Sequence, residues 1–378
     1  MTTTPFLSRL ASEPHALMFA GQSTPWTSAL AELAADPQLD EALHNYARLA
    51  HDLLAPVGAE LLATTGREID LFGFTPNPVH LGAAADATAS VEGIALAQLG
   101  ALLDAAQLGY DVAHAAPRAL LGHSQGILGV HMARAIIDAG SIEAARDAIS
   151  EILAIAALIG AAGTREAHAH GMVPRYGEAT PMLSVKGIMP RQADELIARV
   201  NDARGPIAVA VINAMDHVVL SGHPQDLASF AVEVGKEHAH QAQLRADKVR
   251  GGRVFDPTLE YLDVTLPFHS PLMERAVELV GQWAAACGIG ADHARELAAE
   301  VLLNQVDWSA QVRDLLTENS PRDLWVVDLG PGTTLTKLFA NNAQGTGVGI
   351  VEAAGAQSRA ALAEPGAEPA RTQDWSCF

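Results

Sequence analysis

Hydrophobic positions come in blocks of two lengths along the first part of the chain. Short apolar runs at His15–Phe19 and at residues 119–121 have the length of buried strands. Longer blocks place apolar residues at helical spacing in residues 28–65, 90–108 and 142–158. We expect the last of these helices to end at Gly160 and Gly163. Strands separated by helices predict an α/β arrangement in which helices cover a parallel sheet.

The pattern changes near Thr180. Strand-like and helix-like segments then follow in the order β-α-β-β-α-β, at residues 182–185, 190–200, 207–212, 217–221, 226–237 and 259–266. That order is typical of a ferredoxin-like unit. The expected fold class is therefore α/β, with a large α/β-hydrolase-like subdomain that contains a parallel sheet and an inserted ferredoxin-like small subdomain.

Four segments follow from these patterns. Residues 1–178 are the first part of the large subdomain, residues 179–265 the ferredoxin-like subdomain, and residues 266–352 the second part of the large subdomain. Residues 353–378 are rich in Ala, Pro and Gly, which predicts a linker or tail that leads into a longer polypeptide.

Composition narrows the class of protein. The 378 residues are 49% hydrophobic, enough for a large core, and carry a formal net charge of −20. An acidic chain argues against a nucleic-acid partner, because phosphate binding needs basic surface. The sequence shows no signal peptide and no long uninterrupted apolar run, so we expect a soluble protein without a membrane partner. Two widely separated cysteines, Cys287 and Cys377, are consistent with a reducing, cytoplasmic location.

One short motif carries the strongest chemical signal. Gly122-His123-Ser124-Gln125-Gly126 lies between the apolar run at residues 119–121 and a helical block at residues 127–137. This is G-x-S-x-G between a strand and a helix, the pattern of a nucleophile elbow. The tight turn lifts the serine to a helix N-terminus, where free N–H groups favour developing negative charge. Ser124 is therefore the candidate nucleophile.

A serine near neutral pH needs a base, and the chain offers 15 histidines. His269 stands out because Pro267 and Pro271 restrict the backbone around it. His168 and His170 are read as part of a solvated loop, since neither has further ligands at metal spacing. We predict no metal site.

Several motifs together resemble a known family. They occur in family order: Phe19-Ala-Gly-Gln22-Ser-Thr-Pro-Trp26, Gly122-His-Ser124-Gln-Gly126, Asn213 with Val218-Val-Leu-Ser-Gly222, Pro267-Phe-His269-Ser, and Asp328-Leu-Gly330-Pro-Gly332. This series resembles the malonyl/acetyl-CoA:ACP transacylases over roughly residues 15–352. Pro181-Met-Leu-Ser184 and Gly345-Thr-Gly-Val348 look most like the acetyltransferase (AT) domain of type I fatty acid synthases.

The resemblance implies a ping-pong acyl transfer. Ser124 would take an acyl group from CoA, and the phosphopantetheine thiol of acyl carrier protein would then accept it, with His269 as general base and acid. Backbone N–H groups of Gln22 and Gln125 would form the oxyanion hole. A backbone carbonyl in Asn304-Gln305-Val306-Asp307-Trp308 would orient the histidine. No bound cofactor is implied, and the expected partners are acyl-CoA, acyl carrier protein and other fatty acid synthase domains.

Acyl specificity depends on a departure from the family pattern. Malonyl-transferring members carry an arginine where this chain has Ile159, and an aliphatic side chain leaves a malonyl carboxylate unpaired. His123 and Asn213 also match positions of the acyl site. The missing arginine predicts an acetyl starter unit. Asn213 could equally cap the turn between two strands. A shifted alignment that brings in Arg134, Arg146 or Arg165 would favour malonyl transfer instead.

Other functions remain open at this stage. A serine esterase or thioesterase shares the elbow, but its histidine usually comes near the end of the chain. A non-catalytic docking domain would not need Ser124 and His269 together. For CoA phosphates, Lys186 and the basic loop from Arg245 to Arg253 are candidates, although a solvated loop explains the same residues.

Overall fold

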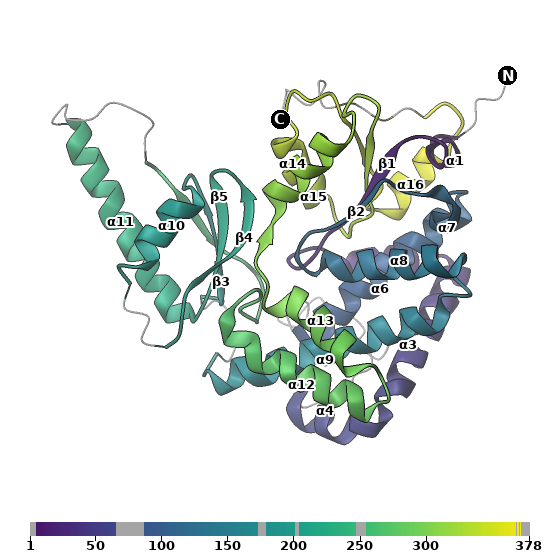
Figure 1. The fold of residues 1–378 in the computed structure, drawn as a ribbon, viewed down its shortest axis with the longest axis horizontal. Helices are drawn as coiled ribbons and strands as arrows, with labels where there is room; N and C mark the ends of the chain where they lie inside the picture. The colour runs from purple at the N-terminus through teal and green to yellow at the C-terminus, as the bar shows by residue number, and fades with distance from the viewer. Residues whose placement is uncertain are drawn as a thin grey trace.

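A computed structural model describes residues 5–65, 87–172, 179–200, 204–246 and 255–367, together with Pro369 and Arg371. It has a large helical and α/β body and a smaller α/β body beside it (Figure 1). The chain enters the smaller body after residue 179 and leaves it after β6 (Thr258–Tyr261).

A parallel sheet organises the large body. Among the described residues its strands are β1 (His15–Phe19), β2 (Ala119–Gly122), β8 (Trp325–Asp328) and β9 (Gly349–Glu352), in the order β2-β1-β8-β9. Every neighbouring pair is parallel. All of β1 is buried, as expected for a parallel sheet covered on both faces. The predicted α/β class and parallel sheet are confirmed.

The helices of this body lie on both sides of the sheet, some against its faces and others in an outer layer that packs on neighbouring helices. On one side they are α1 (Phe6–Leu10), α2 (Trp26–Leu33), α3 (Pro37–Leu54), η1 (Ala55–Val57), α4 (Gly58–Thr65), α6 (Ala87–Gln107), α7 (Val112–Ala115), α8 (Ile127–Ala139), α9 (Arg146–Ala169), η3 (Pro271–Met273), α12 (Glu274–Ala286) and α13 (Ala291–Leu302). On the other are α14 (Trp308–Glu318) and α15 (Thr334–Asn342). The two faces follow from strand alternation: Leu17 and Phe19 belong to the first core, whereas Ala16 and Met18 pack with α14 and α15.

Helix α9 is longer than the sequence pattern suggested. It runs to Ala169, so the expectation that it ends at Gly160 and Gly163 is wrong. A Cβ at Gly160 would lie 2.5 Å from the carbonyl oxygen of Ala87, so this glycine lets α6 and α9 approach closely instead of ending the helix. His168 therefore lies in the last turn of a helix and not in a loop.

Two helices of the large body are long and apolar enough to cross a membrane by length and composition alone. They are α6 and α9. Within the most apolar window of each, 89% and 78% of the residues are buried inside the protein. Burial of this extent is typical of core helices, which pass the same test.

The smaller body confirms the ferredoxin-like pattern. It comprises β3 (Met182–Lys186), α10 (Pro190–Ile197), β4 (Ala208–Ala214), β5 (His217–Ser221), α11 (Pro224–Ala246) and β6 (Thr258–Tyr261). The order β6-β3-β5-β4 is antiparallel throughout. Helices α10 and α11 cover its outer face, remote from the large body (Figure 1). Helix α11 extends well past the expected residue 237, and β6 ends before the expected residue 266.

A fifth strand joins this sheet from outside the insert. Strand β7 (Val306–Asp307) pairs in parallel with β4, with Asp307 opposite Ile212. It was expected within the second part of the large subdomain. Its pairing connects the small sheet directly to the segment that follows α13.

The C-terminal region is not simply a linker. Residues Ala356–Leu362 form α16, where a linker was expected, because Arg359 is buried and pairs with Asp104 of α6 at 2.6 Å. Arg359 also donates to the carbonyl oxygen of Ala353. An Ala-rich segment that buries a paired guanidinium in this way is held against the core.

Candidate active site

The turn after β2 has the geometry of a nucleophile elbow. Ser124 begins a short 3₁₀ helix, η2 (Ser124–Gly126), which continues into α8, and it adopts a φ of +56°. That left-handed conformation is strained for a residue with a side chain, and such strain concentrates at functional sites. A Cβ at Gly122 would lie 2.5 Å from the nitrogen of Ile127, and one at Gly126 would collide with the carbonyl of Phe19. Both glycines of the motif are therefore required by the turn.

The structure brings Ser124 and His269 together across 145 residues of sequence. Ser124 Oγ lies 2.7 Å from His269 Nε2. Both side chains are buried. On the opposite side of the ring, Nδ1 lies 2.7 Å from the backbone oxygen of Asn304. A carbonyl can only accept, so Nδ1 carries the proton and Nε2 is free to accept from the serine hydroxyl.

The backbone at His269 has a left-handed conformation and is held by a hydrogen bond from the next residue. His269 also has a φ of +56°, and the next residue, Ser270, donates its N–H to the oxygen of Leu302 at 2.9 Å. Leu302 ends α13, and Asn304 follows two residues later. The same contact therefore holds the histidine and the carbonyl that orients it. Asn304 lies in the segment expected to supply that carbonyl.

Electrostatics keep this imidazole neutral. Burial, which disfavours the charged ring, lowers the pKa of His269 to about 4. The hydrogen bond to Asn304 raises the pKa and the nearby His123 lowers it, but burial is the largest cause. At neutral pH the ring is therefore a proton acceptor.

The two glutamines predicted to form the oxyanion hole lie next to each other. A Cβ at Gly21 would lie 2.8 Å from the backbone nitrogen of Gln125, so the β1 turn runs directly against the elbow. The side chain of Gln22 donates to Gln125 Oε1 at 2.6 Å, and Ser90 donates to Gln22 Oε1. These contacts hold the two turns together beside Ser124. The role of their N–H groups as oxyanion donors stays a prediction.

The residues predicted to line the acyl site fall into two places. His123 Nε2 and Asn213 Oδ1 lie 2.7 Å apart, so the structure joins the elbow to β4 of the small body. Ile159 lies in the middle of α9, fully buried in the same apolar core as Phe268, the neighbour of His269. Ile159 is thus packed among apolar residues of that core. Its part in specificity stays a prediction.

Sequence reasoning missed the groups that hold Asn213. His217 Nε2 lies 3.4 Å from Asn213 Nδ2, and Ser184 Oγ lies 2.9 Å from the same imidazole nitrogen. Asn342 of α15 donates to the backbone oxygen of Asn213 at 2.8 Å. The sequence could have drawn attention to Ser184, because it is a single polar residue within the apolar strand 182–185.

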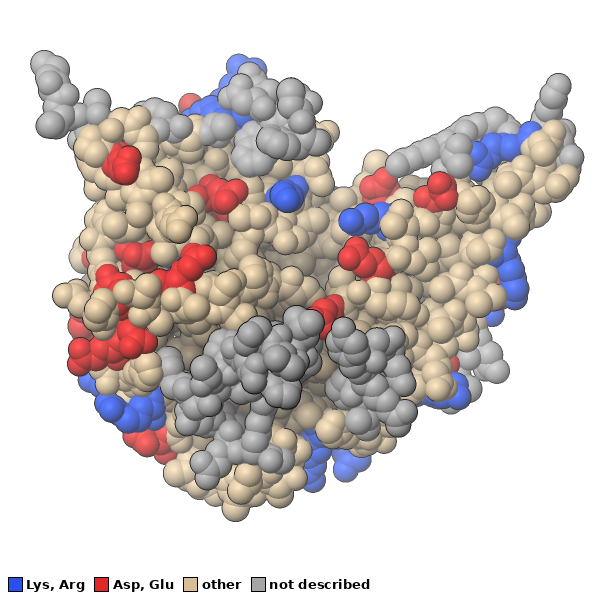
Figure 2. Space-filling view, turned by 180° about the vertical axis from the view of Figure 1, so that it is seen from behind, with Lys and Arg blue, Asp and Glu red and all other residues tan. Residues whose placement is uncertain are grey.

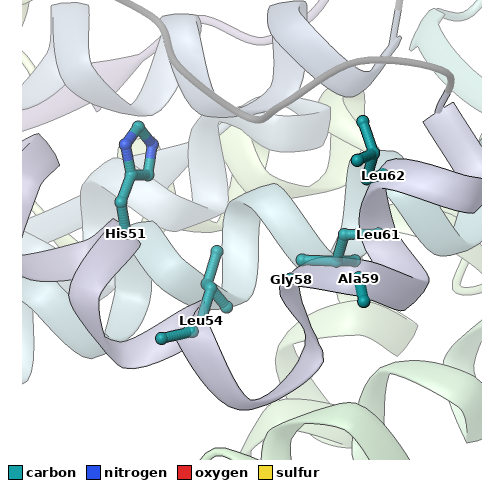
Figure 3. A pocket seen from close by; sticks show the side chains of 7 residues that line it. His51, Leu54, Gly58, Ala59, Leu61 and Leu62 are labelled. Atoms are coloured by element: carbon teal, nitrogen blue, oxygen red, sulfur yellow. The ribbon is translucent and has the colours of Figure 1, made fainter.

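The basic loop and a pocket between two helices are further candidate sites. A pocket of about 380 Å³ lies between α3 and α4 and is lined by His51 and by aliphatic residues such as Leu54 and Leu62 (Figure 3). Most of the basic loop considered for CoA phosphates, from Lys248 on, lies outside the described residues. In the described part of the chain, no group of three or more His, Cys, Asp or Glu side chains has a metal-binding arrangement.

Comparisons with known proteins identify one matching family segment and several similar folds. Residues 181–261 match the family described as the fatty acid synthase central AT domain. The malonyl-CoA:acyl-carrier-protein transacylase of Coxiella burnetii superposes with a TM-score of 0.62 at 18% identity, covering 95% of this chain and 98% of that one. The enzyme of Xanthomonas oryzae pv. oryzae gives 0.61 at 20% identity, covering 92% and 96%.

A third solved structure is a malonyl-transacylase in complex with its type II PKS acyl-carrier protein. It superposes with a TM-score of 0.59 at 17% identity and covers 92% of this chain and 98% of that one. The chain therefore has the fold of the malonyl-CoA:acyl-carrier-protein transacylases, and its residues 181–261 match the model of the fatty acid synthase central AT domain.

Proposed function

We propose that this protein is an acyltransferase that moves an acetyl group from CoA to the phosphopantetheine thiol of acyl carrier protein through an acyl-Ser124 intermediate. The observation that carries this proposal is the contact between Ser124 Oγ and His269 Nε2, with Nδ1 of the same ring on the Asn304 carbonyl. The transacylase fold and the matched AT segment support the same reaction class.

The chemistry follows from this arrangement. His269 Nε2 accepts the Ser124 proton as Oγ attacks the thioester carbonyl, and the imidazolium then protonates the departing CoA thiolate. In the second half of the cycle, neutral His269 accepts the proton of the phosphopantetheine thiol as the sulfur attacks acyl-Ser124. When that tetrahedral intermediate collapses, the imidazolium returns the proton to Ser124 Oγ. The backbone N–H groups of Gln22 and Gln125 would hold the oxyanion in both halves.

The buried Ile159 supports acetyl as the transferred group. A malonyl carboxylate in hydrocarbon surroundings without a cation would cost several kcal/mol, whereas the acetyl methyl group is compatible with them. The rival is malonyl, favoured by the solved structures of similar fold, which are malonyl transacylases. A serine esterase is a further alternative, because it would use the same dyad.

CoA phosphates need local cations on an acidic protein. Lys186 is exposed at the end of β3, directly across the sheet from His217, which is connected to the elbow through Asn213. On the face shown in Figure 2, the described Lys and Arg side chains lie in small separate groups, while acidic side chains gather on the large body. We propose that Lys186 contributes to phosphate binding.

Intact-mass measurement tests the reaction class and the acyl preference together. The protein is mixed separately with acetyl-CoA, malonyl-CoA and a long-chain acyl-CoA, and holo acyl carrier protein is added afterwards. We expect an acetyl adduct that is absent from Ser124→Ala and that disappears when the carrier protein is added, with the acetyl group appearing on the carrier. A larger malonyl adduct would make the enzyme a malonyl transacylase. Rapid adduct loss without an acceptor would make it a hydrolase.

A further inference from the structure

A series of hydrogen-bonded polar side chains extends from the elbow into the small sheet. His123 Nε2 contacts Asn213 Oδ1 at 2.7 Å, and Asn213 Nδ2 contacts His217 Nε2 at 3.4 Å. Ser184 Oγ reaches the same nitrogen of His217 at 2.9 Å. His123 directly precedes the nucleophile, and the other three residues lie on strands of the small body.

Strand geometry explains why these residues meet. In the antiparallel pair β3–β5, Ser184 lies opposite Val219 and His217 lies opposite Lys186, so Ser184 and His217 are diagonal neighbours on one face. The neighbouring residues Leu183 and Val185 pack with α10 and α11 on the other face. Ser184 and His217 therefore lie on the face turned away from those helices.

A register irregularity presents Asn213 to the elbow. The pairing of β4 with β5 shifts between Ile212 and Ala214, so Asn213 is the extra residue of a β-bulge. Bulges re-aim a side chain and are frequent beside active sites. The backbone oxygen of the same residue accepts from Asn342 of α15, so Asn213 is held from the large body as well.

The direction of each hydrogen bond follows from the donor inventory. Asn213 Oδ1 only accepts, so His123 carries its proton on Nε2. Asn213 Nδ2 only donates, so His217 Nε2 is unprotonated and accepts from both Asn213 and Ser184. This requires a neutral His217. Burial first, and then the charges of Lys186 and His123, lower the pKa of His217 to about 4, while Asp216 acts in the opposite direction.

We propose that His217, held by Ser184, is a positioning residue for the transferase reaction: it fixes the amide of Asn213, which fixes His123 and with it the elbow that presents Ser124. The backbone of His123 is anchored to β1 and to the elbow, since its N–H donates to the oxygen of Phe19 and its oxygen accepts from the N–H of Gly126. Its ring also packs edge-on against Trp308 of α14. Displacing the imidazole therefore displaces the turn that carries the nucleophile. This inference rests on the proposed function, but its first test does not.

The first test measures the reactivity of Ser124 without any acyl substrate. Labelling by a small sulfonyl fluoride, followed by intact mass, reports nucleophile activation directly. We expect His217→Ala to label about 10-fold more slowly, the size of one lost positioning hydrogen bond. His223→Ala is the matched control, because His223 is also buried and lies just past the other end of β5, and its ring accepts a local hydrogen bond from the backbone N–H of Gln225. It should label at the wild-type rate.

Conservative and double variants separate positioning from a loss of folding. His217→Gln keeps an acceptor for Asn213 and should recover most of the rate, with a thermal midpoint close to that of the wild type. Because the residues act in series, the double variant His217→Ala/Asn213→Ala should be no slower than Asn213→Ala alone. If the two effects multiply, or if His217→Ala matches the His223→Ala control, the positioning role is refuted.

The second test uses acetyl-CoA and links the inference to the reaction. A positioning defect should lower kcat about 10-fold and leave KM within twofold, since the donor is still bound but attacked more slowly. If wild-type protein is labelled by the sulfonyl fluoride but transfers no acyl group, the proposed function fails while the labelling comparison still decides the role of His217.

Discussion

At the scale of single residues, the base of the dyad is oriented by a backbone carbonyl and not by a carboxylate. The oxygen of Asn304 fixes the tautomer of His269 without adding a negative charge beside the ring. A carboxylate there would stabilise the imidazolium and raise the pKa. With a neutral partner, burial dominates, and the imidazole remains unprotonated far below its usual pKa.

This gives a prediction for the pH dependence of acyl-enzyme formation. Because the pKa of His269 is lowered to about 4, the base is unprotonated above that value, and protonation stops the reaction only below it. The rate of CoA release in the first turnover should therefore stay level from pH 7 to pH 5 and fall with an inflection near 4. Circular dichroism at each pH serves as the control for folding. An inflection near 6.5 would contradict the buried, neutral base.

Acyl specificity gives a second prediction at this scale. Ile159→Arg places a guanidinium at a buried position of α9. We expect it to pair there with a malonyl carboxylate. Malonyl transfer relative to acetyl transfer should rise at least about 10-fold, measured as the ratio of the two kcat/KM values. Ile159→Gln is the control, because it is polar but uncharged and should not raise the ratio. An unchanged ratio in a folded Ile159→Arg protein would show that residue 159 does not line the acyl site.

At the scale of elements, close contact between α6 and α9 positions the supports of the elbow. The carbonyl of Val91 in α6 accepts from the Gln125 side chain at 2.5 Å, and Ser90 donates to Gln22. Helix α6 lies against α9 at Gly160, where a Cβ would press on the backbone of Ala87 and Thr88. A change in the distance between α6 and α9 would therefore shift the groups that support the catalytic turn, as well as the packing of the core.

Gly160→Ala should consequently destabilise the fold. The added methyl group must displace backbone atoms, so we expect the free energy of unfolding to fall by about 1–3 kcal/mol, measured by denaturant titration. Gly235→Ala is the matched control. Gly235 lies inside α11, and apart from the local helix backbone no described atom comes within 4 Å of an added Cβ, so alanine should raise stability by up to about 1 kcal/mol. A Gly160→Ala protein as stable as that control would show that the helices can separate at little cost.

At the scale of the whole molecule, the large body is completed by segments that come late in the sequence. Helix α16 contacts α6 through the buried pair Arg359–Asp104, and the edge strand β9 pairs with β8 just before it. The small sheet is completed in a similar way by β7, which comes from a segment beyond the insert. Each body therefore depends on residues that come late in the sequence.

Arg359→Ala tests the contribution of the C-terminal helix. Removing the guanidinium leaves the Asp104 carboxylate buried without its cation, which should lower the free energy of unfolding by about 3–5 kcal/mol. Asp104→Ala/Arg359→Ala should recover part of this loss, because neither charge is then unpaired. Denaturant titration of the three proteins measures both effects. An Arg359→Ala protein as stable as the wild type would restore the interpretation of residues 353–378 as a linker.

Local sequence determined the features that depend on neighbouring residues. A turn of five residues requires the glycines around Ser124, so the elbow could be predicted. The spacing of apolar positions indicates the β-α-β-β-α-β order, so the small subdomain could be predicted as well. The resemblance to transacylases drew on motifs of the same short range, and it selected His269 from 15 histidines.

Only the tertiary structure decided the contacts between distant segments. Asn304 rather than its neighbours supplies the carbonyl to His269, because Ser270 and Leu302 hold the two loops in that register. The contacts of His217 and Ser184 with Asn213 depend on strand register and on a bulge, which apolar spacing does not reveal. Burial of Arg359 likewise depends on a partner 255 residues away. Such contacts arise from packing of the whole chain, and no short stretch of sequence encodes them.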